Sequence, residues 1–82
     1  MASKKYSRLG DFLKAQTFQA VPITFSAIEA IIGDRLPPSA RKHRAWWSNN
    51  PGNAVITYEW LGAGYRSTDV SMDEERLTFR RA

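Results

Sequence analysis

Cysteine is absent from this chain, and histidine occurs only once, at position 43. Without cysteine the chain has neither a disulfide framework nor a thiolate metal site, and a secreted domain of this size normally depends on one of them. His43 has no second nitrogen or sulfur ligand with which to complete a zinc site. We therefore expect no metal and no cofactor, and we expect a reducing compartment, the cytoplasm, as the location.

Long apolar segments are also missing, since unbroken apolar runs such as Ala30 to Gly33 are only a few residues long. This excludes a membrane-spanning helix, and no apolar stretch of a signal peptide follows the polar start of the chain. We expect no membrane association. A chain of 82 residues, 43% of them hydrophobic, is long enough for one core and too short for two. Residues 1–82 are therefore expected to form a single domain, with 1–5 as a flexible tail.

Acidic residues are lacking between Arg35 and Tyr58, a stretch that contains Arg41, Lys42 and Arg44. The net charge of the whole chain is +4. A local basic stretch in a basic chain favours polyanionic partners, and nucleic acid is the first candidate. A solvated surface that binds nothing anionic is the alternative.

Hydrophobic spacing predicts the elements at the start of the chain. A helix is expected over residues 7–16, because Leu9, Phe12 and Leu13 lie on one helical stripe. Residues 17–23 are rich in β-forming side chains and include Pro22, which is typical of a short edge strand.

Two further helices are predicted in the middle of the chain. The first begins after Thr24 or Ser26, either of which can cap it; Ser26 and Glu29 have capping-box spacing, and Gly33 ends the helix. After two prolines, residues 39–47 continue without a helix breaker and form the third predicted helix.

The last part of the chain reads as a β-meander. Residues 49–53 are a dense turn signal, and residues 55–61 alternate between apolar and polar side chains as a half-buried strand does. Two more strands are expected over 65–71 and 76–81, joined by the acidic turn 72–75. The fold class is therefore α+β, with about three short helices and a small antiparallel sheet. Its order matches winged helix-turn-helix domains, in which the short strand joins the C-terminal hairpin.

A specific pattern extends over nearly the whole chain: TF-x-x-IE-x-x-x-G-x-x-LP-x-SA, then WW-x-N, then W-x-x-AG and a terminal FRR. The residues that carry it are Thr24, Phe25, Ile28, Glu29, Gly33, Leu36, Pro37, Ser39, Ala40, Trp46, Trp47, Asn49, Trp60, Ala63, Gly64, Phe79 and Arg80. In this pattern the chain resembles a family of small bacterial domains of uncharacterised function. The resemblance implies a bacterial or phage-type domain and brings no catalytic residue. The family has a stretch rich in alanine and glutamine, compatible with a helix, where this chain has residues 55–57, so a helix over 53–61 is the alternative to a strand.

The candidate nucleic-acid-binding residues lie mainly in the third predicted helix and its end: Ser39, Arg41, Lys42, His43, Arg44, Trp46 and Asn49. Cations on more than one face of a helix allow it to contact phosphates on one flank and base edges on the other. Arg41 or Arg44 suits a bidentate contact with guanine, and Asn49 suits one with adenine. Arg66 and Arg80 on the predicted hairpin would extend this basic surface, or would be edge-strand charges that discourage aggregation.

The paired tryptophans cannot both point into the core from one helix, because adjacent residues are about 100° apart. Trp47 is the better core candidate, since it shares its spacing with Leu36 and Ala40. Trp46 is then partly exposed as a stacking or packing surface. Burial of both indoles is the alternative.

No enzymatic activity is expected. Ser39 and His43 have no orienting carboxylate nearby and no nucleophile elbow, and the acids of residues 73–75 are typical of a solvated turn. The leading hypothesis is a DNA-binding domain, either a small transcriptional regulator or a DNA-reading module, that contacts phosphates and groove through the third helix and the hairpin. The alternative is a protein-interaction module or inhibitor of the phage or mobile-element type that uses exposed tryptophan and arginine.

Overall fold

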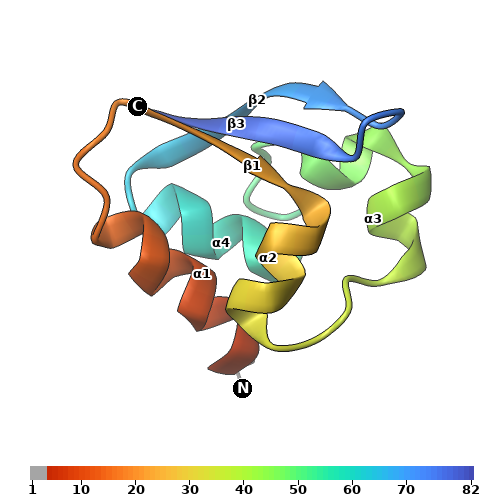
Figure 1. The fold of residues 1–82 in the computed structure, drawn as a ribbon, viewed down its shortest axis with the longest axis horizontal. Helices are drawn as coiled ribbons and strands as arrows, with labels where there is room; N and C mark the ends of the chain where they lie inside the picture. Colours follow the sequence, from red (N-terminus) through yellow and green to blue (C-terminus); the bar gives the residue numbers. More distant parts are fainter. Residues whose placement is uncertain (1–3) are drawn as a thin grey trace.

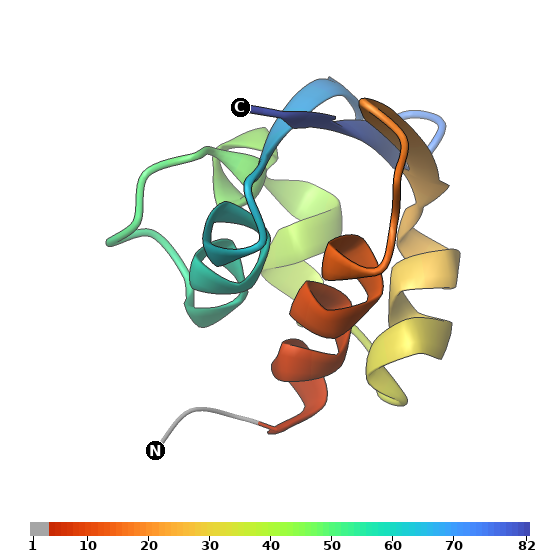
Figure 2. The same cartoon turned by 90° about the vertical axis from the view of Figure 1, so that its left-hand side faces the viewer.

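The computed structural model describes residues 4–82. Its elements are α1 (Lys4–Lys14), β1 (Ala20–Thr24), α2 (Phe25–Ile32), α3 (Pro38–Lys42), the 3-10 helix η1 (Arg44–Trp47), α4 (Val55–Gly62), β2 (Tyr65–Ser71) and β3 (Arg76–Arg81). The strands form one layer, and α1, α2 and α4 lie beneath it (Figure 1). In the view from the side, no helix formed by residues 4–82 covers the other face of the sheet (Figure 2). The α+β class expected from the sequence is confirmed.

The sheet has the strand order β1-β3-β2, and both pairs are antiparallel. Val21 lies opposite Phe79, and Tyr65 lies opposite Arg81. β1 is an edge strand, which accommodates the exposed Pro22 because an edge position does not require its missing N–H. The predictions of a short edge strand that joins a C-terminal hairpin, and of the hairpin itself, are confirmed.

The first helix, α1, begins and ends a little earlier than the predicted range of 7–16. Leu9 and Leu13 are buried as its spacing required. Of the tail expected at residues 1–5, residues 1–3 lie outside the described part of the chain, and residues 4 and 5 belong to α1. Gly10 allows α1 to approach α4 closely, because a Cβ atom there would lie 3.3 Å from the backbone carbonyl oxygen of Glu59.

The second helix, α2, has the predicted limits. The Thr24 hydroxyl caps it by accepting a hydrogen bond from the Ala27 N–H at 3.0 Å. Gly33 ends it in the left-handed region, with φ of 73°, a conformation that favours glycine. The expected capping box between Ser26 and Glu29 is wrong, because the Glu29 carboxylate points away from the cap and binds Leu36 and Arg41.

The continuous third helix predicted over 39–47 is wrong. The chain is helical from Pro38 to Lys42, becomes extended at His43 (φ −122°, ψ 113°), and forms the 3-10 helix η1 after it. The Ala40 carbonyl would accept from the Arg44 N–H in a continuous α-helix; here it accepts from the Trp47 indole N–H at 2.8 Å. The break therefore returns the indole to the core.

The strand predicted over 55–61 is also wrong, and the helix that the family resemblance allowed is present as α4. Its buried residues Ile56, Thr57 and Trp60 share one helical face, whereas Tyr58 is 61% exposed. A short apolar run is compatible with the period of a helix and with that of a strand, so tertiary packing decides which of the two forms. The helix places Trp60 against Trp47 and Phe79, with ring centroids 6.0 and 5.4 Å apart.

The core lies between the sheet and the helices. Phe25, Ile28, Ile32, Leu36 and Phe79, which the sequence placed in one cluster, are all buried in it. Trp47 is buried and Trp46 is half-buried, which confirms the assignment of the two indoles.

One buried polar atom in the described part of the chain has no hydrogen-bond partner, the Thr57 hydroxyl on α4. We expect Thr57→Val to raise the free energy of unfolding by about 1 kcal/mol, because the substitution removes an unsatisfied hydroxyl at nearly constant volume. Thr57→Ser is the matched control: it keeps the hydroxyl, loses a methyl group and is expected to be less stable than the parent. Urea denaturation of the three proteins measures the difference, and a Thr57→Val protein less stable than the parent would show that the hydroxyl contributes to stability.

Candidate nucleic-acid interface

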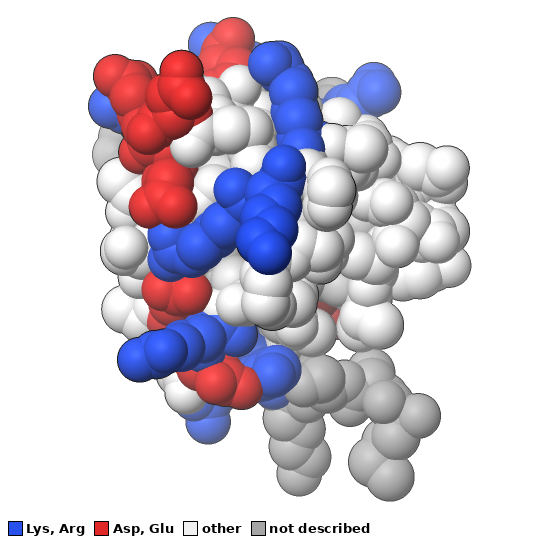
Figure 3. Space-filling model, turned by 90° about the vertical axis from the view of Figure 1, so that its right-hand side faces the viewer, with Lys and Arg blue, Asp and Glu red and all other residues white. Residues whose placement is uncertain are grey.

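The corner between α3 and η1 exposes consecutive basic side chains. Lys42, His43 and Arg44 are all exposed, because the chain turns at His43 and directs this segment away from the core. Basic side chains gather in the middle of the face of the molecule that contains α3, with acidic side chains to one side (Figure 3). The acid-free stretch identified in the sequence therefore contributes to a solvent-facing surface.

Three cations of this stretch carry uncompensated charge. Among residues 4–82, Arg35, Lys42 and Arg44 have no carboxylate within ion-pair distance. Asp34, the acid next to Arg35, is paired with Lys5 on α1 at 2.7 Å. The hydrogen bond from Lys5 lowers the pKa of Asp34 below that of a free aspartate, and the same bond raises the pKa of Lys5. Because the Asp34 carboxylate pairs with Lys5, it does not pair with the Arg35 guanidinium.

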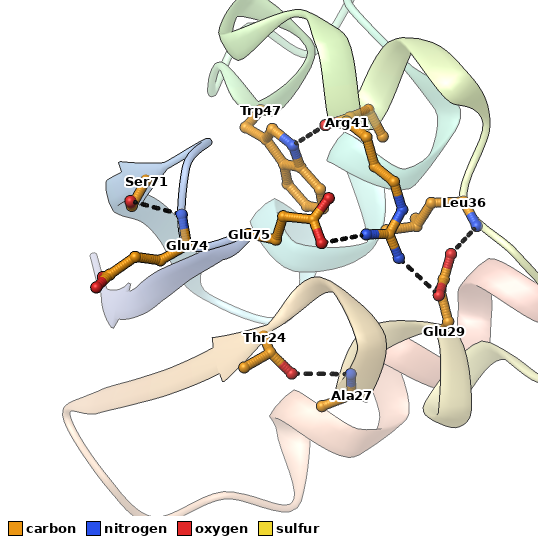
Figure 4. A network of polar contacts seen from close by, with 10 residues as sticks. Thr24, Ala27, Glu29, Leu36, Arg41, Trp47, Ser71, Glu74 and Glu75 are labelled. Carbon is orange, nitrogen blue, oxygen red and sulfur yellow. Dashed lines mark hydrogen bonds and ion pairs between the residues drawn. The ribbon is translucent and has the colours of Figure 1, made fainter.

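Arg41 behaves differently from the other cations of this stretch. Its two terminal nitrogens pair with Glu29 on α2 at 2.8 Å and with Glu75 in the β2–β3 turn at 2.7 Å (Figure 4). The second Glu29 oxygen accepts from the Leu36 N–H at 2.8 Å, and the guanidinium lies 6.0 Å from the centre of the Phe25 ring. The hydrogen bond to Glu75 raises the pKa of Arg41, with the charge of Glu29 acting in the same direction. One of the two arginines considered for a guanine contact is thus engaged in linking α2, α3 and the hairpin turn.

Asn49 is engaged in a similar way. Its amide nitrogen donates to the Ser67 carbonyl at 3.1 Å, and its oxygen accepts from the Ser67 N–H at 2.8 Å. The same oxygen accepts from the Trp60 indole N–H at 3.0 Å. The side chain therefore occupies the edge of β2 as a neighbouring strand would, and its amide is not free for the adenine contact expected from the sequence.

Ser39 and Trp46 complete the set of candidates around α3. Ser39 is half-buried, and its carbonyl accepts from the His43 N–H at the end of α3. The Trp46 ring packs edge-on against Trp47, with centroids 4.7 Å apart. The Asn53 amide holds this segment by donating to the carbonyls of Ala45 and Trp46. One side of the Trp46 ring therefore packs against Trp47, and the half-buried residue still exposes part of its surface to solvent.

The two candidates on the hairpin lie on the uncovered face of the sheet. Arg66 and Arg80 are opposite each other in the β2–β3 register, and both are exposed. Arg80 pairs with Asp69 at 3.2 Å, whereas Arg66 has no ion-pair partner among the described residues. Arg44 borders a cleft of about 430 Å³ between η1 and β2, and Asp69 contributes to the same cleft.

A larger recess, of about 680 Å³, lies between the end of α2 and α3. Its lining residues are Glu29, Arg35, Leu36, Pro38, Arg41 and Lys42. Sequence reasoning placed Arg35 in the basic stretch but did not include it, Leu36 or Pro38 in the site. The sequence signal for this recess was the pair of prolines at 37 and 38. They lie between Arg35 and Arg41 and restrict the direction of the chain between these two cations.

The pattern identified in the sequence corresponds to a known family model. The model for the Domain of unknown function DUF7662 matches residues 6–82. The chain belongs to the DUF7662 family. Comparison with curated proteins and with solved structures found no match.

In this DUF7662 domain, the match begins in α1 and includes every element from β1 to β3. Residues 4–82 of the domain contain no group of three or more histidine or acidic side chains placed to hold a metal ion. Within the same residues, no helix is long and apolar enough to cross a membrane.

Proposed function

We propose that the protein binds nucleic acid non-covalently, through phosphate contacts made by Arg35, Lys42 and Arg44. One observation carries this proposal: these cations are exposed on one segment, and no carboxylate among the described residues neutralises them. Unpaired lysine and arginine side chains bind phosphate by displacing condensed counterions, and this supplies most of the affinity for a polyanion. Arg41 and Asn49 are excluded from the contact set because they hold the fold together.

The topology supports a winged-helix type of domain, because the strand order β1-β3-β2 joins an early strand to a C-terminal hairpin. In such domains the helix before the hairpin enters the major groove. Here that helix is α4, which has no lysine or arginine and exposes Val55 and Tyr58. The charges therefore favour backbone contacts from the α3–η1 corner over base reading by α4. In the cell, a protein that binds in this way would act as a DNA-reading component or as a small regulator.

Salt dependence tests the proposal directly. In fluorescence anisotropy with labelled oligonucleotides, the affinity of the parent is expected to fall steeply as salt rises. The double variant Lys42→Ala/Arg44→Ala is expected to bind more weakly, with the slope of log Kd against log salt reduced by roughly one for each phosphate that is no longer bound. Its melting temperature should match that of the parent, because both side chains are exposed.

The matched control removes the same charge from α1, where Arg8 and Lys14 are also exposed. Arg8→Ala/Lys14→Ala is expected to keep most of the affinity and of the salt slope. If both double variants lost the same affinity, the loss would follow from the lower net charge of the protein alone. That result would contradict a site at the α3–η1 corner. A parent that shows no salt-sensitive binding to any duplex or single strand would contradict nucleic-acid binding altogether.

A protein-interaction module is the second candidate function, and the exposed side of α4 favours it. Val55 and Tyr58 lie one turn apart, and the two residues are 52% and 61% exposed. An apolar exposed side on a helix that also buries its opposite side is typical of contact with a protein partner. Binding that is insensitive to salt and lost in Tyr58→Ala would support this function in place of the first.

A further inference from the structure

The recess between α2 and α3 combines apolar side chains with two cations that have no ion-pair partner among the described residues. Leu36 and Pro38 supply the apolar surface, and Arg35 and Lys42 lie on either side of them in the sequence. Its volume of about 680 Å³ is within the range of small-ligand sites. It is therefore large enough to receive an organic group as well as to bind phosphate.

The other charged groups of the recess pair with one another and with Glu75, and Glu29, Glu75 and Arg41 together carry one net negative charge. The Glu29 carboxylate binds Arg41 with one oxygen and the Leu36 N–H with the other. Arg41 also pairs with Glu75, so its guanidinium is held in place at the side of the recess (Figure 4). The positive charges left to attract a ligand are those of Arg35 and Lys42. A ligand that matches this arrangement has a flat or apolar body with anionic groups beside it.

We infer that the recess receives one nucleotide of a single-stranded nucleic acid, with its base against Leu36 and Pro38 and its flanking phosphates on Arg35 and Lys42. This inference rests on the proposed function and names its substrate class. A base that is paired and stacked in a duplex is not available to a recess, whereas an unstacked base of a single strand enters it without that cost. The break at His43 points the same way, since the α3–η1 segment that contains Lys42 and Arg44 does not form one continuous helix for major-groove reading, and α4 has no lysine or arginine.

The test compares a short oligothymidylate with a duplex of the same length and uses Pro38→Glu as the key variant. Position 38 is the first residue of α3, where a carboxylate suits the helix dipole, so this variant is expected to fold as the parent does. The added negative charge should repel the phosphates and weaken single-strand binding about tenfold, a loss of about 1.4 kcal/mol. Arg35→Ala should also weaken it. Thr17→Glu, which adds the same charge in the loop after α1, should bind nearly as the parent does. Pro38→Gln, which removes the apolar contact but adds no charge, should bind more weakly than the parent and more tightly than Pro38→Glu.

A second measurement places the ligand. Thymidine 5′-monophosphate, thymidine and inorganic phosphate are titrated separately into ¹⁵N-labelled protein, and the backbone amide of Leu36 is followed because it lies at the recess. The nucleotide is expected to shift this resonance more than phosphate or nucleoside alone, and Pro38→Glu should abolish the shift.

The outcomes separate this inference from the proposed function. Salt-sensitive binding that is equal for duplex and single strand, with Pro38→Glu indistinguishable from Thr17→Glu, would overturn the recess assignment and leave phosphate binding standing. Binding of the free nucleotide without binding of the oligonucleotide would overturn the assignment to a strand. Absence of salt-sensitive binding to either nucleic acid would overturn both.

Discussion

Replacement of Trp47 by alanine is expected to leave the folded protein with little or no stability at room temperature. The indole is buried, lies nearly parallel to the Phe25 ring at 4.6 Å and to the Trp60 ring at 6.0 Å, and donates to the Ala40 carbonyl. Loss of a buried tryptophan costs roughly 3–5 kcal/mol, and a small domain has only about 5 kcal/mol to lose. The substitution therefore removes most of the free energy of unfolding.

Far-UV circular dichroism and urea denaturation measure this effect. Trp46→Ala is the matched control, because Trp46 has the same side chain at the adjacent position but is only half-buried. It is expected to destabilise the protein by clearly less than Trp47→Ala and to leave a cooperative transition. If the two variants were equally stable, Trp47 would not be the anchor that joins η1 to the core.

The second large effect is expected for Asn49→Ala. This substitution leaves the Ser67 N–H, the Ser67 carbonyl and the Trp60 indole N–H without their partner. Buried or half-buried polar groups left unpaired cost roughly 1–3 kcal/mol each, and water that enters the gap recovers part of this. We expect a total loss of about 2–4 kcal/mol in the free energy of unfolding.

The neighbouring Asn50 provides the control for this prediction. Its side chain is exposed and accepts one local hydrogen bond from the Gly52 N–H, so Asn50→Ala should cost well under about 1 kcal/mol. Urea denaturation compares the two variants with the parent. A stable Asn49→Ala protein with impaired nucleic-acid binding would instead restore Asn49 to the role of a base-contacting residue.

Several features of the fold were predictable because their signals are local. Thr24 caps α2 with its own hydroxyl, and Gly33 ends the helix in a conformation that glycine adopts readily. Pro22 indicated an edge strand because it cannot donate to a second neighbour. For the candidate site, the same kind of reasoning identified the exposed segment at Lys42 and Arg44, since a stretch without acids has no nearby partner for its cations.

The sequence by itself therefore determined the limits of α2, the hairpin and its pairing with β1, the burial of Trp47 and the position of the basic stretch. Only the tertiary structure decided the rest. It made residues 55–62 a helix, because Trp60 packs against rings from η1 and β3. It also paired Arg41 with Glu75, a residue far away in the sequence, and placed Arg35 and Lys42 at a recess without an ion-pair partner among residues 4–82. The physical reason is that helix caps and turns depend on neighbours within a few residues, whereas the period of a short apolar run and the partner of a charge depend on which distant segments fold against them.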